Sequence, residues 1–189
     1  MSECTWPSSD LMKKYHEVEW CRINKNDDYI FEMLSLEGAQ AGLSWETVIQ
    51  KREAYQAAFK QFSIDRCAAL TDEELENIKT EYNVIKHIGK IKSVKSNALL
   101  VQEIQQTYGS FADFLWSYVD GEPIINEWHD MSEVPAETNL SIKLSKDLKK
   151  LGFKFVGPKI MYSFLQSIGI IDDHLITCPY HSYNRNKKG

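Results

Sequence analysis

Cysteine and histidine side chains near both ends of this chain could together hold a metal ion. Cys4 and His16 lie near the start, and His174 and Cys178 lie near the end. His174 and Cys178 are four positions apart, so in a helix their side chains would share one face. Two thiolates and two imidazoles make a closed tetrahedral set, which is typical of structural rather than catalytic zinc.

Spacing alone does not decide between this zinc set and ordinary buried or surface residues, because pairing across the chain is not visible in a sequence. Two further residues are rival ligands, namely Cys21 and His181. If zinc binds, we expect it to join the first and last segments of the chain.

A second group of residues with chemical potential is aromatic. Trp6, Tyr15 and Trp20 fall within the first 20 residues, and Glu37 and Trp45 follow in one short segment. Stacked rings with one carboxyl group can hold a flat cationic heterocycle through stacking, cation–π attraction and a hydrogen bond to an exocyclic amine. Taken alone, the same residues could equally be core fillers and a solvated helix end.

These side chains must be positioned by helices, because helical patterns dominate the sequence and strand patterns are nearly absent. Asn26 or Asp27 can cap a helix that ends near 38–42, and Ser44 can cap a helix whose apolar face continues to Phe59. Thr71 begins a capping box, and a longer helix runs from about Ile88 to a stop at Gly109.

The second half of the sequence predicts three more helices and one long connection. Ser110 caps a short aromatic helix, a basic helix closes at Gly152, and Gly157-Pro158 starts an apolar helix that stops at Gly169. Residues 120–139 have little periodicity and are interpreted as a surface connection. The polar segment after Pro179 is expected to be frayed.

Charge is segregated along the chain. The net charge is −5, yet five lysines and one acid occupy 79–95, and six lysines and one acid occupy 143–159. A net acidic chain argues against a broad basic surface for nucleic acid, and the two lysine-rich windows weaken that objection. They could also be the solvated faces of two helices.

Residues 71–109 have the pattern of a helix-hairpin-helix motif, with a short helix, a tight turn and a longer helix that begins near Gly89. Backbone N–H groups at such a helix start, beside Lys86 and Lys90, could bind a DNA phosphate. Unrelated helix packing explains the same pattern equally well.

Length and composition indicate a globular protein with a sizeable core. The chain has 189 residues, of which 43% are hydrophobic and 26% charged. No apolar run approaches the roughly 20 residues of a membrane helix. The first residues lack a secretory signal pattern. We therefore expect a cytoplasmic monomer without membrane contact, in which the four cysteines are reduced.

Eight segments, in order, resemble the bacterial 3-methyladenine DNA glycosylase I family. They are Cys4-Thr-Trp6, Tyr15-His-Glu-Val-Glu-Trp20, Leu36-Glu-Gly-Ala-Gln-Ala-Gly-Leu-Ser-Trp45, Ile85-Lys-His-Ile-Gly-Lys-Ile91, Phe114-Leu-Trp-Ser-Tyr118, Leu144-Ser-Lys-Asp-Leu-Lys-Lys150, Gly152-Phe-Lys-Phe-Val-Gly157, and Asp173-His174 through Cys178. One such segment could arise by chance, whereas the ordered set is specific and extends over nearly the whole chain.

The resemblance implies an all-α protein with the helix-hairpin-helix DNA glycosylase fold, in which a zinc site joins the N- and C-terminal segments. It implies a single domain over 1–189, with the hairpin motif at about 71–109, zinc-linked termini at 1–20 and 170–180, and a polar tail at 180–189. The implied activity is hydrolysis of the N-glycosidic bond of 3-methyladenine in double-stranded alkylated DNA, after the base flips into an aromatic pocket.

The resemblance also assigns roles to residues. The catalytic candidates that contact the base are Glu37 and Tyr15. The pocket walls are Trp45, which stacks on the base, Trp6 and Trp20. The DNA contacts are Gly42 and Leu43 at the gap left by the base, and Lys86, Gly89 and Lys90 at the phosphates. The ligands of one structural zinc ion are Cys4, His16, His174 and Cys178.

Methylation at N3 makes the base a cationic, good leaving group, and the family lacks the catalytic aspartate that many superfamily relatives carry. Glu37 is therefore assigned first to base recognition. Two departures from the family pattern are Glu17, where aspartate is usual, and Cys21, where glycine is usual. The alternatives are a non-catalytic helix-hairpin-helix DNA-binding protein with structural zinc, and a zinc-stapled helical interaction domain.

Overall fold

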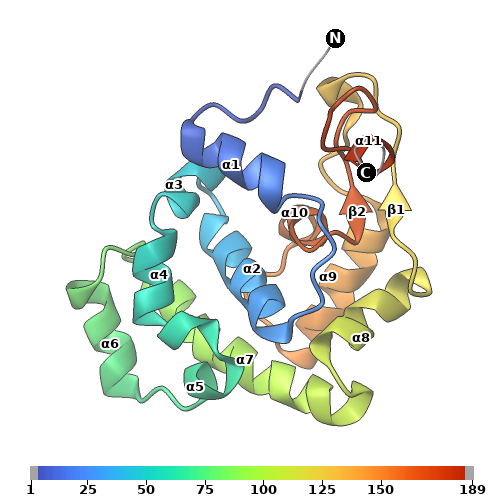
Figure 1. Cartoon of the computed structure of the whole chain (residues 1–189). Coiled ribbons are helices and arrows are strands. Elements are labelled where there is room, and N and C mark those ends of the chain that lie inside the picture. The colour runs from blue at the N-terminus through green and yellow to red at the C-terminus, as the bar shows by residue number, and fades with distance from the viewer. Residues whose placement is uncertain (1–3, 186–189) are drawn as a thin grey trace.

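The structure, a computed structural model, describes residues 4–185 and is almost entirely helical, which confirms the predicted fold class (Figure 1). The α-helices are α1 (Asp10–Val18), α2 (Asp27–Gln40), α3 (Trp45–Ile49), α4 (Arg52–Ala58), α5 (Ile64–Ala68), α6 (Asp72–Glu81), α7 (Ile88–Tyr108), α8 (Phe111–Trp116), α9 (Asn139–Leu151), α10 (Pro158–Ser167) and α11 (Ser182–Arg185). The shorter elements are η1 (Lys60–Phe62), η2 (Ser117–Val119), η3 (Met131–Glu133), β1 (Ile124–Ile125) and β2 (Ile171–Asp172). Residues 1–3 and 186–189, the outer ends of the predicted zinc-linked segment and polar tail, lie outside the described residues.

Helix α2 lies at the centre of the fold. Asn26 caps it as predicted, since its side chain accepts a hydrogen bond from the Tyr29 N–H at 2.9 Å. Most of its residues are buried, and it packs against α3, α7, α8 and α10. Burial on most sides is typical of such a central position. Helix α2 therefore carries two acidic residues, Glu32 and Glu37, into the interior.

The end of α2 is fixed by a lysine from α7. Lys90 Nζ donates to the carbonyl oxygens of Ala39 at 3.0 Å and Ala41 at 2.6 Å. These bonds satisfy carbonyl groups that the end of a helix leaves unpaired. The chain then turns through Gly42 at a φ of +80°, a conformation that favours glycine.

The single helix predicted after Ser44 is wrong, because the segment forms two short helices. Ser44 caps α3 as predicted, accepting from the Thr47 N–H at 3.2 Å. Helix α3 ends at Ile49, and α4 begins at Arg52. The apolar spacing that suggested one helix is real, since the apolar members of the stripe are buried. The turn between α3 and α4 keeps both short helices packed on the core.

Most other predicted helix ends are confirmed. Thr71 forms a complete capping box with Glu74, and Ser110 caps α8. Gly109 and Gly152 follow α7 and α9 with positive φ values of +90° and +102°, as expected for glycines that end helices. Helix α10 begins with Pro158 at its first position.

The turn between α9 and α10 packs against the start of α7. The ring centroids of His87 and Phe155 are 5.8 Å apart. Phe155 also lies against Gly38 of α2, where an added Cβ would come within 3.3 Å of the Phe155 Cβ. The structure thus contains two pairs of helices joined by turns, α6 with α7 and α9 with α10. Their lysine-rich sequence windows meet beside α2.

Residues 120–139, interpreted as a surface connection, partly enter the fold. Strand β1 pairs in parallel with β2, with Ile124 opposite Ile171. Trp128 is partly buried, and its indole N–H donates to Asp173 at 2.7 Å. The sequence did not show this pairing because two residues are too few for strand alternation to appear.

The polar segment after Pro179, expected to be frayed, is held in place as far as Arg185. The Ser182 N–H donates to Asp172 Oδ2 at 2.9 Å. Arg185 Nη2 donates to the Cys21 carbonyl oxygen at 3.1 Å. A buried carboxylate and a backbone carbonyl thus give this polar segment partners that composition did not reveal.

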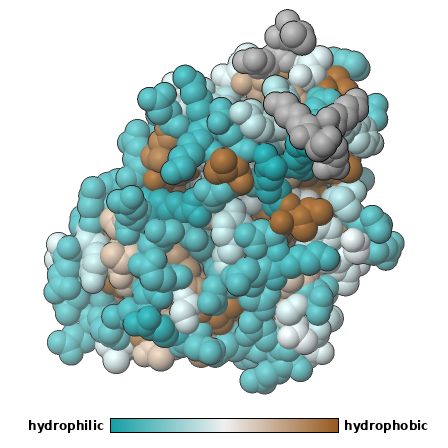
Figure 2. Space-filling model, viewed as in Figure 1, coloured by the Kyte–Doolittle hydropathy of each residue, from teal (hydrophilic) through white to brown (hydrophobic). Residues whose placement is uncertain are grey.

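One hydrophobic core cluster extends from Cys4 to Cys178. Figure 2 shows a face covered mostly by hydrophilic residues, with hydrophobic residues scattered among them. Within residues 4–185, no helix has both the length and the apolarity needed to cross a membrane.

Candidate functional site

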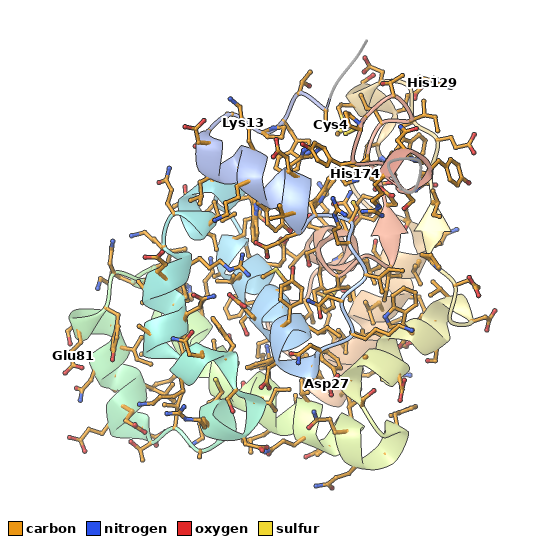
Figure 3. All side chains as sticks on the ribbon, in the orientation of Figure 1. Cys4, Lys13, Asp27, Glu81, His129 and His174 are labelled. Atoms are coloured by element: carbon orange, nitrogen blue, oxygen red, sulfur yellow. The ribbon has the colours of Figure 1, made fainter. Side chains whose placement is uncertain are left out.

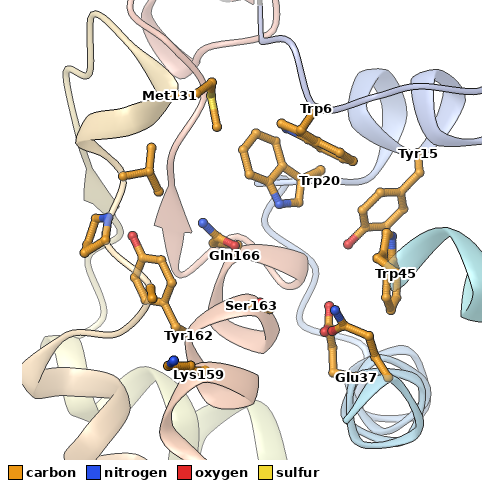
Figure 4. Close-up of a pocket in the computed structure, with 14 residues that line it drawn as sticks. Trp6, Tyr15, Trp20, Glu37, Trp45, Met131, Lys159, Tyr162, Ser163 and Gln166 are labelled. Carbon is orange, nitrogen blue, oxygen red and sulfur yellow. The ribbon is translucent and has the colours of Figure 1, made fainter. Parts of the chain in front are cut away.

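All five predicted pocket residues line one cavity of about 390 Å³ (Figure 4). They are Trp6, Tyr15, Trp20, Glu37 and Trp45. They come from the N-terminal segment, α1, the turn after α1, α2 and α3. This volume is suited to a small heterocycle. The fold therefore brings together one residue from each of these five elements.

Aromatic rings form one side of the cavity. The centroid of the Trp6 ring is 5.0 Å from that of Trp20 and 6.3 Å from that of Tyr15, both in edge-to-face geometry. Trp45 lies 5.2 Å from Tyr15 in a tilted arrangement. Edge-to-face packing is favourable and holds the rings in fixed orientations. A flat ligand would meet a wall that is already formed.

Glu37 is the carboxylic acid of the cavity. It lies in the last turn of α2, is only 3% exposed, and its Oε2 atom has no hydrogen-bond partner. Burial raises the pKa of Glu37 to about 8, because removal from water disfavours the charged form. At neutral pH the group is therefore mostly a protonated carboxyl, with one donor and one acceptor side.

Four buried polar atoms at the cavity have no hydrogen-bond partner among residues 4–185. They are Trp6 Nε1, Glu37 Oε2, Gln40 Oε1 and Trp45 Nε1. A buried polar atom without a partner is costly, and folded proteins contain few of them. Such atoms from three segments that converge on one cavity indicate a site that a ligand completes.

Several lining residues were missed by sequence reasoning. Helix α10 contributes Lys159, Tyr162, Ser163 and Gln166. The connection before α9 contributes Met131, Val134, Pro135 and Ala136, and α2 contributes Gln40. The α10 residues follow helical spacing along one face, a signal that could have found them. It was missed because the helix was interpreted as apolar core. The connection carried no comparable pattern.

Three of the four predicted zinc ligands, from the first and last described segments, lie together. Figure 3 labels Cys4 and the fourth predicted ligand, His174, in the same part of the fold. We call Cys4, His16, His174 and Cys178 the clasp. The donor atoms of Cys4, His16 and Cys178 all lie within 4.8 Å of one another, and all three residues are buried. The Cys178 Sγ is 3.8 Å from His16 Nε2.

His174 joins the clasp through its ring, whose centroid is 4.7 Å from that of His16. Its Nδ1 is 2.8 Å from Asp172 Oδ1, and its Nε2 lies 3.3 Å from the His16 carbonyl oxygen. The helix that would have placed His174 and Cys178 on one face is absent, because 173–181 forms turns and bends. A carboxylate on Nδ1 is the arrangement that leaves Nε2 as the ligating nitrogen.

The sulfur atoms of the clasp are suited to a metal. A hydrogen bond from the Cys4 thiol lowers the pKa of Cys178, which favours the thiolate, the form that binds metal. Two sulfur and two imidazole donors, all buried, are the chemistry of a closed zinc site.

One rival ligand, Cys21, lies beside the clasp residue His174, since the donor atoms of Cys21, Asp172 and His174 are within 4.8 Å of one another. The Cys21 Sγ accepts the Asp173 N–H at 3.3 Å. His181 Nε2 is 2.9 Å from the Asn126 carbonyl oxygen. Cys21 adopts a φ of +58°, so the position where the family usually has glycine keeps its left-handed turn with a side chain present.

The clasp and the cavity share their aromatic residues. The Trp6 ring centroid is 5.5 Å from that of His16, and the Trp20 ring centroid is 4.7 Å from that of His174. Helix α1 places Tyr15 on the cavity and its neighbour His16 on the clasp. The position of the aromatic wall therefore depends on the clasp.

Of the predicted DNA-contacting residues, Gly42 and Leu43 lie next to the cavity along the chain, and the others lie at the start of α7. Gly42 and Leu43 are exposed in the turn between the cavity residues Gln40 and Trp45. Lys86, just before the start of α7, and Gly89, in its first turn, are also exposed. The Lys90 ammonium group is bonded to the end of α2, and burial lowers its pKa. It fixes the turn that carries Gly42.

A second set of lysines was not assigned a DNA contact from the sequence. Lys146, Lys149 and Lys150 are exposed on α9, and Lys159 lines the cavity on α10. Helix α9 buries its opposite face through Leu144 and other residues. The exposed lysine face and the cavity therefore belong to one pair of packed helices.

Comparison with known proteins gives consistent matches. A sequence profile described as methyladenine glycosylase matches residues 5–181. The DNA-3-methyladenine glycosylase 1 of Escherichia coli (strain K12) is 42% identical over 186 residues, which cover 98% of this chain and 100% of that protein.

Two solved structures have the same fold. A crystal structure of 3-methyladenine DNA glycosylase I superposes with a TM-score of 0.91 at 44% identity, covering 95% of this chain and 100% of that one. A tyrosine-to-phenylalanine variant of 3-methyladenine DNA glycosylase I, solved in complex with 3-methyladenine, gives a TM-score of 0.92 at 36% identity, covering 96% of this chain and 98% of that one. Because the profile, the relative and the superposed structures all match over nearly the whole chain, the chain belongs to the methyladenine glycosylase family.

Proposed function

We propose that this protein is a DNA glycosylase that hydrolyses the N-glycosidic bond of 3-methyladenine in alkylated double-stranded DNA. The observation that carries the proposal is the cavity, where aromatic rings surround a buried carboxyl group whose oxygen has no partner. Glycosylases must flip their target base out of the helix into such a pocket. Relatives that share this fold are named for this activity.

Glu37 would recognise the edge of adenine. That edge presents an exocyclic amine beside a ring nitrogen acceptor. A carboxyl group whose pKa is raised to about 8 is protonated at neutral pH, so it can accept a hydrogen bond from the amine and donate one to the ring nitrogen. Trp45 and Tyr15 would pack against the flat face of the base.

The reaction needs little further help from the protein. Methylation at N3 gives the base a positive charge, so the electron pair of the breaking bond to N9 neutralises it as it leaves. Water adds to C1′ of the sugar and releases a proton. Aromatic faces attract a cation, and they stabilise the charged base while excluding water from its faces.

Lysines beside the cavity would hold the DNA backbone. The exposed set comprises Lys146, Lys149 and Lys150 on α9, together with Lys86 near the start of α7. Phosphate contacts supply most of the sequence-independent affinity for DNA. Gly42 and Leu43 would occupy the gap that the flipped nucleotide leaves, next to the cavity.

The clasp would hold one structural zinc ion through Cys4, His16, His174 and Cys178. The grouped donor atoms of Cys4, His16 and Cys178 and the Asp172 carboxylate behind His174 support this assignment. Zinc would fix the two ends of the chain. A non-catalytic DNA-binding protein would also have use for such a clasp, but not for a base-sized cavity with unpartnered polar atoms.

Release of free base from alkylated DNA tests the proposal. Purified protein is incubated with methylated duplex DNA, and the released bases are separated by chromatography. We expect 3-methyladenine to be released by the native chain and by the surface control Glu103→Gln, and very little by Glu37→Ala. No release by the correctly folded native chain would contradict the proposed function.

A further inference from the structure

Lys159 is the only cationic side chain among the described residues that line the cavity. It lies in the first turn of α10, on the same wall as Tyr162 and Ser163 (Figure 4). Its ammonium group forms no ion pair and no hydrogen bond with any of residues 4–185. A cation in the first turn of a helix is also unfavourable, because the helix dipole is positive there. Neither a contact nor the helix accounts for a charge at this position, which suits an anionic ligand instead.

Lys159 lies at the open end of the α10 wall. Gln166, about two helical turns further along the same face, is 8% exposed, and Tyr162 is 3% exposed. Lys159 itself is exposed. The wall therefore runs from a closed end at Gln166 to an open end at Lys159. A base that enters the cavity stays attached to its sugar and phosphates until the bond breaks, so we expect the sugar and phosphates beside the open end.

The lysines of α9 occupy a different position. Lys146, Lys149 and Lys150 line a surface pocket together with Pro158, the residue before Lys159. None of these three lysines lines the cavity. They can contact the phosphates of any duplex that lies across α9, whether or not a nucleotide is flipped. Lys159 lies where this surface meets the cavity.

We propose that Lys159 binds a phosphate of the flipped nucleotide, which moves toward the cavity when the base enters it. This inference rests on the proposed function, in which the base leaves the duplex. Flipping rotates the nucleotide about its backbone, so the adjoining phosphates leave their regular positions. A lysine ammonium group binds phosphate as a point charge. Lys159 then favours DNA with an extruded nucleotide over undamaged DNA, whereas the α9 lysines add affinity without this preference.

The test compares two duplexes of the same sequence by fluorescence anisotropy. One is undamaged, and the other carries a tetrahydrofuran residue, a sugar analogue that is easily extruded because it has no base to unstack. We expect Lys159→Gln to lower the ratio of tetrahydrofuran-duplex affinity to undamaged-duplex affinity about fivefold, the size of one exposed contact between unit charges. The matched control Lys149→Gln should weaken binding to both duplexes alike and leave the ratio unchanged. Lys159→Arg keeps the charge and should keep the native ratio.

The salt dependence of binding gives a second measurement. In Lys159→Gln the slope of log affinity against log salt should fall by about one unit for the tetrahydrofuran duplex only, because one phosphate contact is lost. An unchanged affinity ratio in Lys159→Gln, or no preference of the native chain for the tetrahydrofuran duplex, overturns the proposal. Native protein that releases base from DNA while Lys159→Gln keeps the native ratio contradicts this inference alone, whereas absence of release contradicts the proposed function.

Discussion

The cavity and the clasp lie side by side and share aromatic rings, yet their polar atoms are in opposite situations. In the clasp, sulfur and nitrogen atoms face one another, and His174 has a partner at each ring nitrogen. At the cavity, four buried polar atoms have no partner. Satisfied polar groups stabilise a fold, whereas unsatisfied ones lower its stability until a ligand arrives. The difference separates a region that holds the protein together from a region that binds.

The largest expected effect is on stability and comes from the clasp. His174→Ala should lose the metal and about 4 kcal/mol of unfolding free energy, the scale associated with loss of a metal site. For a chain of this size the thermal midpoint should then fall by about 10 °C. Metal analysis and thermal unfolding measure the two effects together.

The matched control is Cys67→Ala, because Cys67 is a buried cysteine far from the clasp whose thiol donates to the Phe59 carbonyl oxygen. It should reduce stability modestly and leave the metal content at about one zinc per chain, as a single four-ligand site requires. Retention of zinc by His174→Ala would show that the ligand set is wrong.

The next largest effect is on activity and comes from Glu37. Glu37→Ala removes both the donor and the acceptor of the carboxyl group, so base release should slow about a hundredfold, the upper range for hydrogen bonds to a charged partner. Single-turnover release measures this rate. A Glu37→Ala rate within a factor of two or so of the native rate would show that Glu37 does not recognise the base.

Replacement of Glu37 by glutamine, which does not titrate, should change the pH dependence of stability. Because the pKa of Glu37 is about 8 in the folded protein and its ordinary value is 4.5, the folded protein holds, between these two pH values, a proton that the unfolded chain has lost. Stability of the native chain should therefore fall as pH rises through this window, by up to roughly 1.4 kcal/mol per pH unit. Glu37→Gln should be free of this loss, so its advantage in chemical denaturation should grow from pH 5 to pH 8.

A smaller effect is expected from the stacking wall. Trp45→Ala should weaken binding of free 3-methyladenine by about ten- to hundredfold, as removal of one stacked ring from a base generally does. Tyr108→Ala, which removes an exposed ring outside the cavity, is the control for loss of an aromatic side chain. Equal affinities for the two variants in calorimetry would place the base elsewhere.

The smallest effect is expected from single lysines. Lys149→Gln should reduce the slope of log affinity against log salt by about one unit if Lys149 contacts a phosphate. Binding of free 3-methyladenine should not change, since Lys149 does not line the cavity. Fluorescence anisotropy with duplex DNA at several salt concentrations gives the slope. An unaltered slope would show that the DNA binds to another face of the protein.

Local chemistry explains which parts of the fold the sequence predicted. Thr71, Ser110 and Pro158 act within one helical turn, so their signals were visible and correct. The break between α3 and α4 was invisible, because the same apolar spacing continues on both sides of it. Strand β1 and the bonds of Ser182 depend on partners about 50 and 10 residues away, which no local pattern encodes.

The candidate site divides in the same way. The residues of the aromatic wall could be predicted because they lie within the resemblance to the family. Asp173 also lay in a quoted segment, but the hydrogen bonds that it accepts come from residues such as Asn126 and Tyr162, which meet it only in three dimensions. Lys90 looked like a phosphate ligand from its charge, and its contacts with the end of α2 appear only in the structure.

The most direct test of the division between cavity and clasp is a single-turnover release assay on three proteins, namely the native chain, Glu37→Ala and His174→Ala, at a temperature where the folded fraction of each is measured. We predict that Glu37→Ala is fully folded and releases 3-methyladenine about a hundredfold more slowly. His174→Ala should lose metal and release base in proportion to its folded fraction. A fully folded, metal-free His174→Ala without activity, beside an active Glu37→Ala, would contradict this account.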